Sequence, residues 1–317
     1  MKPWFVDLFC GAGGAGLGLK RAGLEPLLGV DKYSRAVEVY REAVGPAIRA
    51  DVRELDPRHV MRQMALALDG VFLLWASPPC PPWSPGRKWR GLAMGFETED
   101  GLLLLEPLRW AEALRPRWVI VENVGTLPDE AAEAVASKLR EMGYVARVLR
   151  LDARAWVPQS RDHAFVVGGP VRIPDPAPPL FAPRFADIMD GEGARPVEPQ
   201  VWRHWMRNKY NVPIVEPDGV LPTVSTRGYH QRWTGIVYEG NGRYRFPTFK
   251  EAARAQGFPD DHPLHRLAAE TSTVAWRLLG DAVPVPMAEA LGRAVLMAEE
   301  AIAGGAARHG RGAGLGG

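Results

Sequence analysis

The first half of the chain alternates short apolar runs with amphipathic stretches. Strands are predicted where apolar residues run together, at residues 4–9, 26–30, 47–50, 71–75, 118–121, 145–149 and 164–167. Helices are predicted between them, where apolar residues recur at helical spacing, at residues 16–22, 34–43, 57–68, 101–114 and 129–142. This alternation predicts an α/β fold with a mostly parallel sheet, helices on both faces, and ligands at the carboxyl ends of the strands.

The pattern changes near residue 168. Through about residue 247 the chain is rich in Pro, Gly, Trp and Tyr, with short β-like pieces and no long amphipathic helix. Helical spacing returns at residues 248–256, 273–279 and 286–303, and the last of these helices is predicted to pack back on the first domain. We therefore predict four parts, namely a first domain (1–169), a smaller irregular domain (170–272), a returning C-terminal segment (273–303) and a disordered tail (304–317).

Composition narrows the class of protein. A length of 317 residues predicts about two domains, and a chain that is 46% hydrophobic and 24% charged is globular. The two cysteines, Cys10 and Cys80, exclude a disulfide framework and a four-cysteine zinc site, and we expect no metal. The start has no signal-peptide pattern and no apolar run is long enough for a membrane span, so we expect a soluble cytosolic protein. The net charge of +2 neither predicts nor excludes nucleic acid.

A glycine-rich turn follows the first predicted strand. Residues 7–14 read Asp-Leu-Phe-Cys-Gly-Ala-Gly-Gly, and glycines at this place allow the backbone to approach a ligand. Asp31 ends the second strand, where it can accept hydrogen bonds from ribose hydroxyls, and Asp51 follows the third, where it can accept one from an amine. Without a Walker lysine pattern, an adenosine compound with a neutral or cationic head fits better than a triphosphate. The alternative is that both aspartates are helix caps.

A cysteine in a proline-rich turn follows the fourth predicted strand. Residues 77–84 read Ser-Pro-Pro-Cys-Pro-Pro-Trp-Ser, and the prolines make the loop around Cys80 rigid. The end of a central parallel strand is where an α/β enzyme holds a nucleophile. The basic residues Arg87, Lys88 and Arg90 are expected to raise the thiolate fraction of Cys80 and to close over a polyanion. The alternative is a surface turn with an incidental cysteine.

A carboxylate follows the fifth predicted strand, which is otherwise apolar. Burial there is expected to raise the pKa of Glu122, so that it can donate a proton to a ring nitrogen. The alternative is a capping role for Glu122 or Asn123.

With these residues in place, the chain resembles the DNA (cytosine-5) methyltransferases of the bacterial restriction-modification type. Residues 7–14 resemble the cofactor loop of that family, residues 79–84 its Pro-Cys-x-x-x-Ser motif and residues 122–124 its Glu-Asn-Val motif. Residues 159–163 resemble its Gln-x-Arg-x-Arg motif, residues 251–259 its Arg-Glu-x-x-Arg-x-x-Gly-Phe-Pro block and residues 280–284 its Gly-Asn-x-Val-Pro block. The six blocks occur in the family's order over nearly the whole chain.

The resemblance implies a Rossmann-like methyltransferase domain that binds S-adenosylmethionine and yields S-adenosylhomocysteine. By the resemblance, Phe9 would pack on the adenine, with Gly11 and Gly13 near the methionine end. Asp31 would bind the ribose and Asp51 the adenine amine. Pro79, Asp281 and Ala282 would close the pocket.

The resemblance also implies a mechanism. Cys80 would add to carbon 6 of a cytosine flipped out of duplex DNA, so that carbon 5 becomes nucleophilic. Glu122 would bind ring nitrogen 3 and the exocyclic amine, and Arg161 would contact the carbonyl oxygen or hold the thiolate. The domain at 170–272 would recognise the target sequence. Predicted DNA contacts come from polar and basic side chains, namely Ser84, Arg87, Lys88, Arg203, Arg207 and Arg227.

Three residues depart from the family pattern. His163 stands in place of the second Arg of the Gln-x-Arg-x-Arg motif, as a catalytic residue whose charge depends on pH. Asp281 replaces the usual Asn, which alters the expected affinity for the cofactor, and Lys250 stands where Arg is common. Because the nucleophile and the acid are both present, we expect an active enzyme.

Three other functions are weighed against this one. They are a tRNA cytosine-5 methyltransferase, a catalytically silent DNA-binding relative, and a nicotinamide-dependent oxidoreductase that would share only the glycine loop. Methylation of duplex DNA is favoured because the long Trp- and Arg-rich region suits DNA recognition and because both Cys80 and Glu122 are present. We expect a monomer in the bacterial cytoplasm or nucleoid, with a cognate restriction endonuclease as a partner that acts on the same site.

Overall fold

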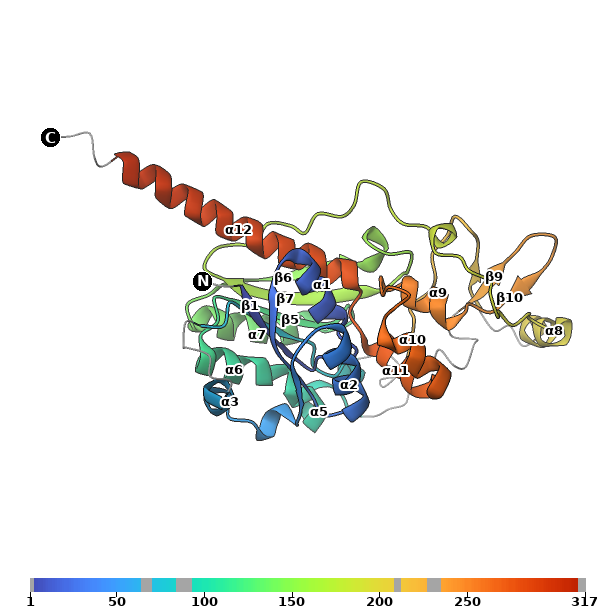
Figure 1. Ribbon diagram of the computed structural model, residues 1–317, viewed down its shortest axis with the longest axis horizontal. Coiled ribbons are helices and arrows are strands. Elements are labelled where there is room, and N and C mark those ends of the chain that lie inside the picture. Colours follow the sequence, from blue (N-terminus) through green and yellow to red (C-terminus); the bar gives the residue numbers. More distant parts are fainter. Residues whose placement is uncertain (1–2, 64–69, 84–92, 208–211, 227–234, 313–317) are drawn as a thin grey trace.

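The computed structural model describes residues 3–63, 70–83, 93–207, 212–226 and 235–312. A seven-stranded sheet with the order β3-β2-β1-β4-β5-β7-β6 forms the centre of the molecule (Figure 1). Its strands are β1 (Trp4–Leu8), β2 (Glu25–Asp31), β3 (Ala47–Arg49), β4 (Leu73–Ala76), β5 (Trp118–Val124), β6 (Val145–Asp152) and β7 (Asp162–Gly169). This confirms the expected α/β class.

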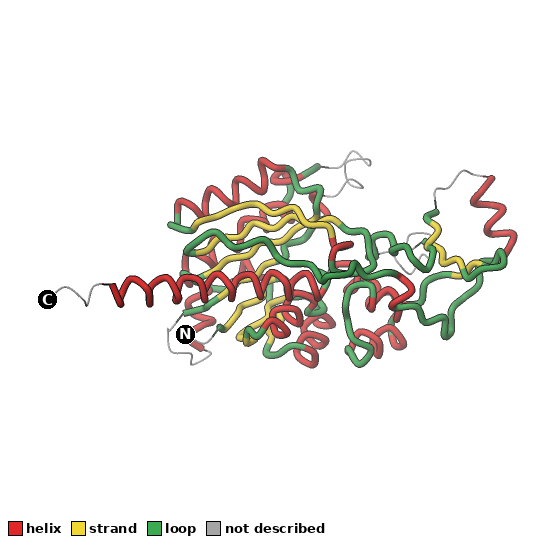
Figure 2. The backbone as a smooth tube through the Cα atoms, turned by 90° about the horizontal axis from the view of Figure 1, so that it is seen from above, coloured by secondary structure: helices red, strands yellow, loops and turns green. Residues whose placement is uncertain are grey.

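Helices cover both faces of the sheet (Figure 2). On one face lie α1 (Gly14–Ala22), α2 (Ser34–Ala43) and α12 (Val285–Gly312), and on the other α3 (Pro57–Gln63), α6 (Glu106–Leu114) and α7 (Asp129–Glu141). Successive strand residues point to opposite faces, so Phe5 packs into the first apolar layer and Val6 into the second. The inner strands of the sheet (β1, β2, β4, β5 and β7) are therefore buried on both sides, whereas the edge strands β3 and β6 are partly exposed.

The first and the last long helices pack closely together. A Cβ added to Gly18 of α1 would lie 2.4 Å from the Val285 carbonyl oxygen, and one added to Gly292 of α12 would lie 2.8 Å from the Ala22 Cβ. Side chains at these glycines would force the two helices apart. The predicted packing of the C-terminal helix on the first domain is thus confirmed, with glycine at the points of closest approach.

One strand, β7, runs antiparallel to the rest of the sheet. β7 pairs antiparallel with both β5 and β6, and therefore lies between them. Only a short 3₁₀ turn (Ala153–Ala155) and a loop join β6 to β7, too little chain for the crossover helix that a parallel pair requires.

A smaller three-stranded sheet, with the order β10-β9-β8, occupies the Pro- and Gly-rich part of the chain. It consists of β8 (Ile214–Val215), β9 (Ile236–Tyr238) and β10 (Tyr244–Arg245). Near it lie α8 (Pro199–Arg207) and α9 (Phe249–Arg254), followed by α10 (Pro263–Glu270) and α11 (Ser272–Asp281). Arg245 joins this sheet to α9, because its Nη2 donates to Glu251 Oε1 at 2.6 Å and both side chains are buried.

Several predicted elements differ from those observed. The helix predicted at residues 101–114 is divided into α5 (Glu99–Leu102), a 3₁₀ turn (Leu103–Leu105) and α6, because Pro107 lies in the first turn of α6 and cannot donate its backbone N–H to a preceding turn. Helices α8 and α10 were not predicted. Each begins at or next to a proline, and Pro263 follows the capping residue His262.

The C-terminal prediction is wrong in part. We placed a disordered tail at residues 304–317, whereas α12 continues to Gly312. Alanines at positions 301, 303, 306 and 307 have the highest helix propensity, and they extend the helix beyond its packed part. Residues 64–69 of the helix predicted at 57–68 lie outside the described part of the chain.

Two further findings concern the described ranges. None of the helices in these ranges is long and apolar enough to cross a membrane. In the same ranges, no three His, Cys, Asp or Glu side chains come together as a metal site would require.

Candidate functional site

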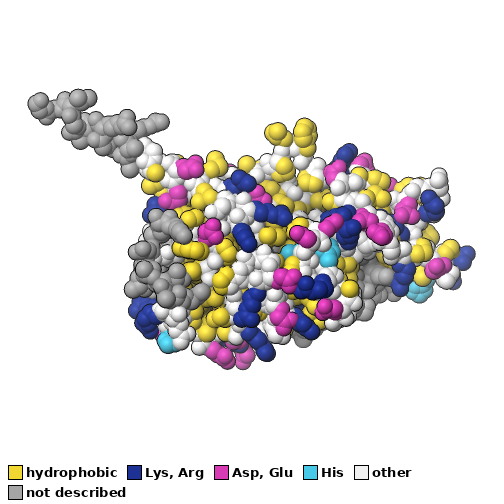
Figure 3. Space-filling view, in the orientation of Figure 1, with side chains coloured by type: hydrophobic (Ala, Val, Ile, Leu, Met, Phe, Trp, Pro, Cys, Tyr) yellow, Lys and Arg dark blue, Asp and Glu magenta, His cyan; other side chains and the backbone are white. Residues whose placement is uncertain are grey.

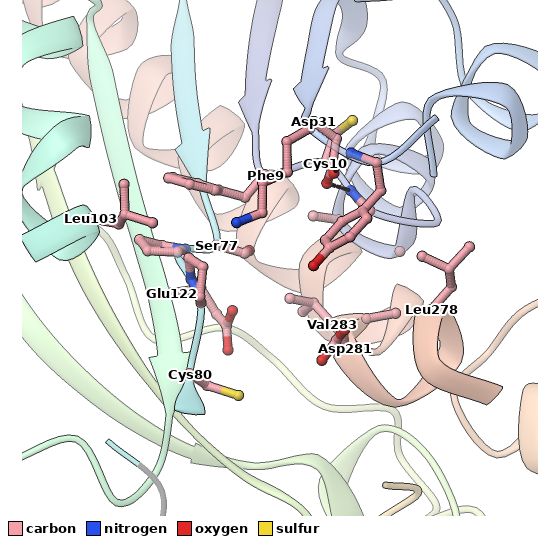
Figure 4. A pocket seen from close by; sticks show the side chains of 18 of the residues that line it. Phe9, Cys10, Asp31, Ser77, Cys80, Leu103, Glu122, Leu278, Asp281 and Val283 are labelled. Atoms are coloured by element: carbon pink, nitrogen blue, oxygen red, sulfur yellow. Dashed lines mark hydrogen bonds between the residues drawn. The ribbon is translucent and has the colours of Figure 1, made fainter. Parts of the chain in front are cut away.

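A cavity of about 220 Å³ opens at the carboxyl ends of β1, β2, β4 and β5, with the end of α11 as its opposite wall (Figure 4). Ten of the predicted site residues line it, namely Phe9, Gly11, Asp31, Asp51, Pro79, Cys80, Glu122, Arg161, Asp281 and Ala282. The predicted cofactor and catalytic residues therefore meet in one place, although they lie far apart in the sequence.

The turn after β1 has an unusual backbone. Phe9 has a φ of 59°, which is rare for a residue with a side chain, and Gly11 has a φ of 52°. A strained non-glycine residue of this kind persists only where its surroundings fix it, and here it lies at the cavity wall. The backbone N–H of Gly11 donates to Asp31 Oδ2 at 3.0 Å, which ties the turn to the end of β2.

Gly13 has a different role from the one predicted. A Cβ on Gly13 would lie 2.6 Å from Val44 Cγ2, and its φ of 85° is in the left-handed region. Gly13 thus faces the end of α2, while the next residue, Gly14, contributes to the cavity wall. The left-handed backbone and the close contact with Val44 therefore explain why residue 13 is a glycine.

Both aspartates also accept local hydrogen bonds from the backbone, and their roles toward a ligand remain predictions. Asp31 Oδ1 accepts from the Tyr33 backbone N–H at 2.9 Å, and burial raises the pKa of Asp31. Asp51 caps a 3₁₀ turn and accepts two hydrogen bonds from the Arg53 side chain at 2.7 and 3.0 Å. The hydrogen bonds from Arg53 lower the pKa of Asp51 to about 2, so Asp51 is a carboxylate at neutral pH.

Hydrogen bonds between neighbouring strand ends hold the loop that carries Cys80. In the parallel register of β4 and β5, Ala76 lies opposite Val121, so the loop leaves β4 beside Glu122. Asn123 Nδ2 donates to the Pro78 carbonyl at 3.1 Å. The Trp83 N–H donates to the Cys80 carbonyl at 2.9 Å, which closes the turn around the cysteine.

The pKa of Cys80 is shifted opposite to expectation. Burial, followed by the negative charge of Asp281, raises the pKa of the thiol to about 11, while Arg161 lowers it. The prediction of a raised thiolate fraction is therefore wrong for the ligand-free chain. Arg87, Lys88 and Arg90, on which that prediction rested, lie outside the described residues.

Glu122 is paired with His163. Nδ1 of His163 lies 2.7 Å from Oε1 of Glu122, and both side chains are buried. Burial lowers the pKa of His163, although Glu122 opposes the shift, so the imidazole is neutral at pH 7. His163 therefore lies behind Glu122, away from the cavity surface. It is a neutral neighbour of Glu122, at the position where the resembled family carries an arginine.

Arg161 joins three parts of the chain. Its Nη1 donates to the Gly280 carbonyl at 2.8 Å and to the Val224 carbonyl at 3.2 Å. Gly280 is the second-last residue of α11, and Val224 lies in the chain between β8 and β9. The guanidinium is thereby fixed at the cavity wall beside Cys80.

Asp281 faces Cys80 and Glu122 from the opposite wall (Figure 4). Desolvation raises its pKa to about 6, with Arg277 and Arg161 opposing the shift. The Arg277 guanidinium lies 4.3 Å from the ring centre of Tyr33, and both residues line the cavity.

Asp7 is the first residue of the glycine-rich segment 7–14, and the sequence alone predicts no role for it. It is fully buried in β1, and neither carboxylate oxygen has a hydrogen-bond partner among the described residues. Burial raises its pKa to about 8; the Tyr40 hydroxyl is close enough to lower that pKa but lacks hydrogen-bond geometry. The sequence signal was present, since an acidic residue inside the apolar strand Trp-Phe-Val-Asp-Leu is costly to bury.

The predicted DNA contacts lie apart from this cavity or outside the described residues. Arg203 and Arg207 are exposed on α8, at the end of the molecule opposite the tip of α12 (Figure 1). Basic side chains are visible at that end in Figure 3, while acidic and basic groups are interspersed elsewhere on the face drawn. Ser84, Arg87, Lys88 and Arg227 lie outside the described ranges.

Comparison with known families gives one match over most of the chain. The family model for C-5 cytosine-specific DNA methylase matches residues 4–178 and 189–297. The matched ranges include every residue that lines the cavity.

Individual proteins match over similar lengths. The chain is 26% identical to the Type II methyltransferase M.NlaX of Neisseria lactamica, over 94% of this chain and 97% of that protein. It is 30% identical to the Type II methyltransferase M.AgeI of Thalassovita gelatinovora, but over only 55% of this chain and 41% of that protein. Among solved structures, the Entamoeba histolytica methyltransferase EhMeth has a TM-score of 0.76 at 14% identity, covering 93% of this chain and 98% of that one. The S. pombe Dnmt2 methyltransferase has a TM-score of 0.71 at 20% identity, covering 94% and 99%. At such identities these structures establish the shared fold.

Proposed function

The chain belongs to the C-5 cytosine-specific DNA methylase family, and we propose that its cavity holds S-adenosylmethionine beside a cytosine flipped out of duplex DNA. As a member of that family, the chain is an enzyme that methylates carbon 5 of cytosine in DNA. The observation that carries the proposal is the meeting of Cys80 and Glu122, at adjacent strand ends, in the same cavity as Asp31 and Asp281.

The residues present fit S-adenosylmethionine. The unpartnered, buried carboxyl of Asp7 reaches the same cavity as Asp31, and the cofactor carries an ammonium group and ribose hydroxyls that hydrogen-bond to such groups. Phe9, Leu103 and Val283 supply apolar surface for a base. Asp51 is a carboxylate that can accept from an exocyclic amine while still bonded to Arg53.

In the proposed mechanism the Cys80 thiolate adds to carbon 6 of the cytosine, the electron pair of the carbon 5–carbon 6 double bond forms a carbon 4–carbon 5 double bond, and the carbon 4–nitrogen 3 pair moves onto nitrogen 3. Glu122 hydrogen-bonds ring nitrogen 3, which gains negative charge as the sulfur adds, and His163 Nδ1 holds the Glu122 carboxyl in place. Arg161 is fixed by two carbonyls, so it is oriented before the base enters. When bound, S-adenosylmethionine supplies an electrophilic methyl group to carbon 5. Loss of the carbon 5 proton to water then restores the double bond and expels Cys80.

Residues 170–272 are proposed to read the target sequence, with Arg203 and Arg207 on phosphates. Because relatives such as M.NlaX are named Type II methyltransferases, we include in the proposal a restriction endonuclease of the same specificity, in a bacterial cytoplasm. Ser84, Arg87, Lys88 and Arg227 remain proposed DNA contacts.

Covalent trapping tests the proposal. A duplex containing 5-fluorocytosine cannot lose a proton from carbon 5, so the wild-type chain with S-adenosylmethionine should remain attached to it. Cys80→Ser should abolish the adduct and lower methylation of normal duplex by about 10⁴-fold or more, because the nucleophile is lost. Target sites are found by bisulfite sequencing of DNA from cells that express the wild-type chain.

Cys10→Ala is the matched control, since it removes the chain's other thiol. It should form the adduct at a rate within a few-fold of the wild type. A wild-type chain that binds duplex and cofactor yet forms no adduct would instead be a binding protein. Transfer of labelled methyl groups to tRNA but not to duplex DNA would identify an RNA methyltransferase.

A further inference from the structure

Asp281 lies where the resembled family carries Asn, and it adds a negative charge to the cavity. It is the last residue of α11, and its side chain is 46% exposed. Figure 4 shows its carboxylate across the open space from Cys80 and Glu122. The extra charge therefore faces the reacting groups from the opposite wall.

The ligand-free chain leaves this charge poorly neutralised. Asp281 pairs with Arg277, and the distance between Arg277 Nε and Asp281 Oδ2 is 4.0 Å, at the limit for an ion pair. Arg277 is engaged by the ring and hydroxyl of Tyr33, and Arg161 by two backbone carbonyls. Arg277 and Arg161 thus both make closer contacts with other groups than with Asp281.

Cys80 faces three charged groups from three elements. Asp281 extends from α11 and Glu122 from β5, and both oppose a thiolate, while Arg161, just before β7, favours one. Asp281 has the larger effect of the two acids. In turn, Asp281 is faced by Arg277 on its own helix, by Arg161 and by Asp31 at the end of β2. Burial and two carboxylates therefore outweigh one arginine.

We infer that Asp281 couples cofactor occupancy to the reactivity of Cys80. In the ligand-free chain burial keeps the thiol protonated and the negative charge of Asp281 adds to this effect, whereas a cation in the cavity offsets the charge of Asp281 and makes it easier for the thiol proton to pass to solvent. The inference rests on the proposed function, in which the cavity receives S-adenosylmethionine. S-adenosylmethionine carries one more positive charge than S-adenosylhomocysteine, because its sulfur is a sulfonium. Asp281 therefore gives Cys80 a larger thiolate fraction with the methyl donor bound than with the product bound.

The test measures thiolate formation without methyl transfer. The rate of Cys80 alkylation by iodoacetamide is followed from pH 6 to pH 12 without ligand, with S-adenosylmethionine and with S-adenosylhomocysteine. The midpoint of the pH curve reports the pKa of the thiol even where a ligand slows the reagent. In the ligand-free chain, Asp281→Asn should lower the midpoint by about one pH unit, roughly a tenfold faster reaction at pH 8. S-adenosylmethionine should lower the wild-type midpoint by a similar amount, and S-adenosylhomocysteine by much less.

Two variants provide the controls. Cys80→Ala leaves Cys10 as the remaining thiol and gives the background rate. Asp100→Asn removes a different carboxylate from the cavity wall, one that is not a cause of the Cys80 pKa shift, and it should keep the wild-type midpoint. A far-ultraviolet circular dichroism spectrum and a urea unfolding midpoint like those of the wild type show that each variant is folded.

Equal midpoints for the wild type and Asp281→Asn would overturn the inference. So would equal wild-type midpoints with S-adenosylmethionine and S-adenosylhomocysteine. Trapping on 5-fluorocytosine duplex separates this failure from that of the proposed function. An intact adduct with an unmoved midpoint refutes the coupling alone, whereas a missing adduct refutes the role of Cys80.

Discussion

The central sheet and the small sheet of this molecule are held together by different interactions. The central sheet lies between two apolar layers, with Trp75, Trp110 and Trp118 fully buried. The small sheet has only a small apolar cluster, which includes Phe185 and Val237, and it is joined to α9 by a buried ion pair. Apolar contact alone is sufficient for the first region, whereas the second depends on a few polar contacts with fixed geometry.

The largest effect is expected from breaking that ion pair. Arg245→Met leaves Glu251, which is fully buried, without its cation, and should lower the free energy of unfolding by about 3–5 kcal/mol. Urea unfolding measures the loss. Cleavage by protease near residues 190–245 should show whether the small sheet opens first.

Two variants sharpen this prediction. Arg243→Met changes an exposed arginine two residues away and should alter the free energy of unfolding by less than about 0.5 kcal/mol. Arg245→Met combined with Glu251→Met should be more stable than Arg245→Met alone, because no charge is left buried and unpaired. If Arg245→Met and Arg243→Met are equally stable, the comparison between the two regions is wrong.

A smaller effect is expected from Asp7, the buried carboxyl group within the apolar central sheet. Asp7 keeps its proton in the folded chain up to about pH 8, but an unfolded chain loses it near pH 4. The folded chain binds more protons between these values, so the stabilising contribution of Asp7 is fully present below pH 4 and is lost as the pH rises to 8. Asp7→Asn has no such titration. Relative to the wild type, it should gain at least about 2 kcal/mol between pH 4 and pH 8.

Urea unfolding of the ligand-free wild type and Asp7→Asn at pH 4, 6 and 8 measures this difference. Parallel stability curves for the two proteins would show that Asp7 titrates normally in the folded chain, and that the central sheet has no costly carboxylate.

The smallest effect is expected on the surface of the second region. Replacing both Arg203 and Arg207 by Ala should weaken duplex binding about 3–10-fold and reduce its salt dependence, since each lost phosphate contact lowers the slope by about 0.9. Lys138→Ala, on the exposed side of α7, should leave both unchanged. Fluorescence anisotropy at several salt concentrations measures the affinities, and unchanged binding by the double variant would place the DNA elsewhere.

The difference between the two regions also explains which features could be predicted from the sequence. The strands of the central sheet were predicted because their apolar runs are buried on both faces, and side-chain pattern is the direct cause of that burial. The meeting of Cys80, Glu122 and Asp31 was expected because carboxyl ends of parallel strands share one edge of a sheet. Their chemical roles remain predictions.

The other features depend on contacts between residues far apart in the sequence, and the local pattern of apolar and polar residues does not encode such contacts. The position of β7 between β5 and β6 is set by pairing with strands distant in sequence. The raised pKa of Cys80 depends on Asp281, some 200 residues later, and the anchoring of Arg161 on carbonyls of Val224 and Gly280. Asp7 is the residue whose signal was local and was missed.

The contact between α1 and α12 has a consequence for synthesis of the chain. Gly18 and Gly292 bring together a helix that leaves the ribosome early and one that is made about 270 residues later. At 5–20 residues per second, the apolar face of α1 waits between about 14 and 55 s for its partner. That face of the central sheet therefore remains without its α12 cover until α12 has been made. We expect nascent chains to bind chaperones through this exposed face until the final helix is released.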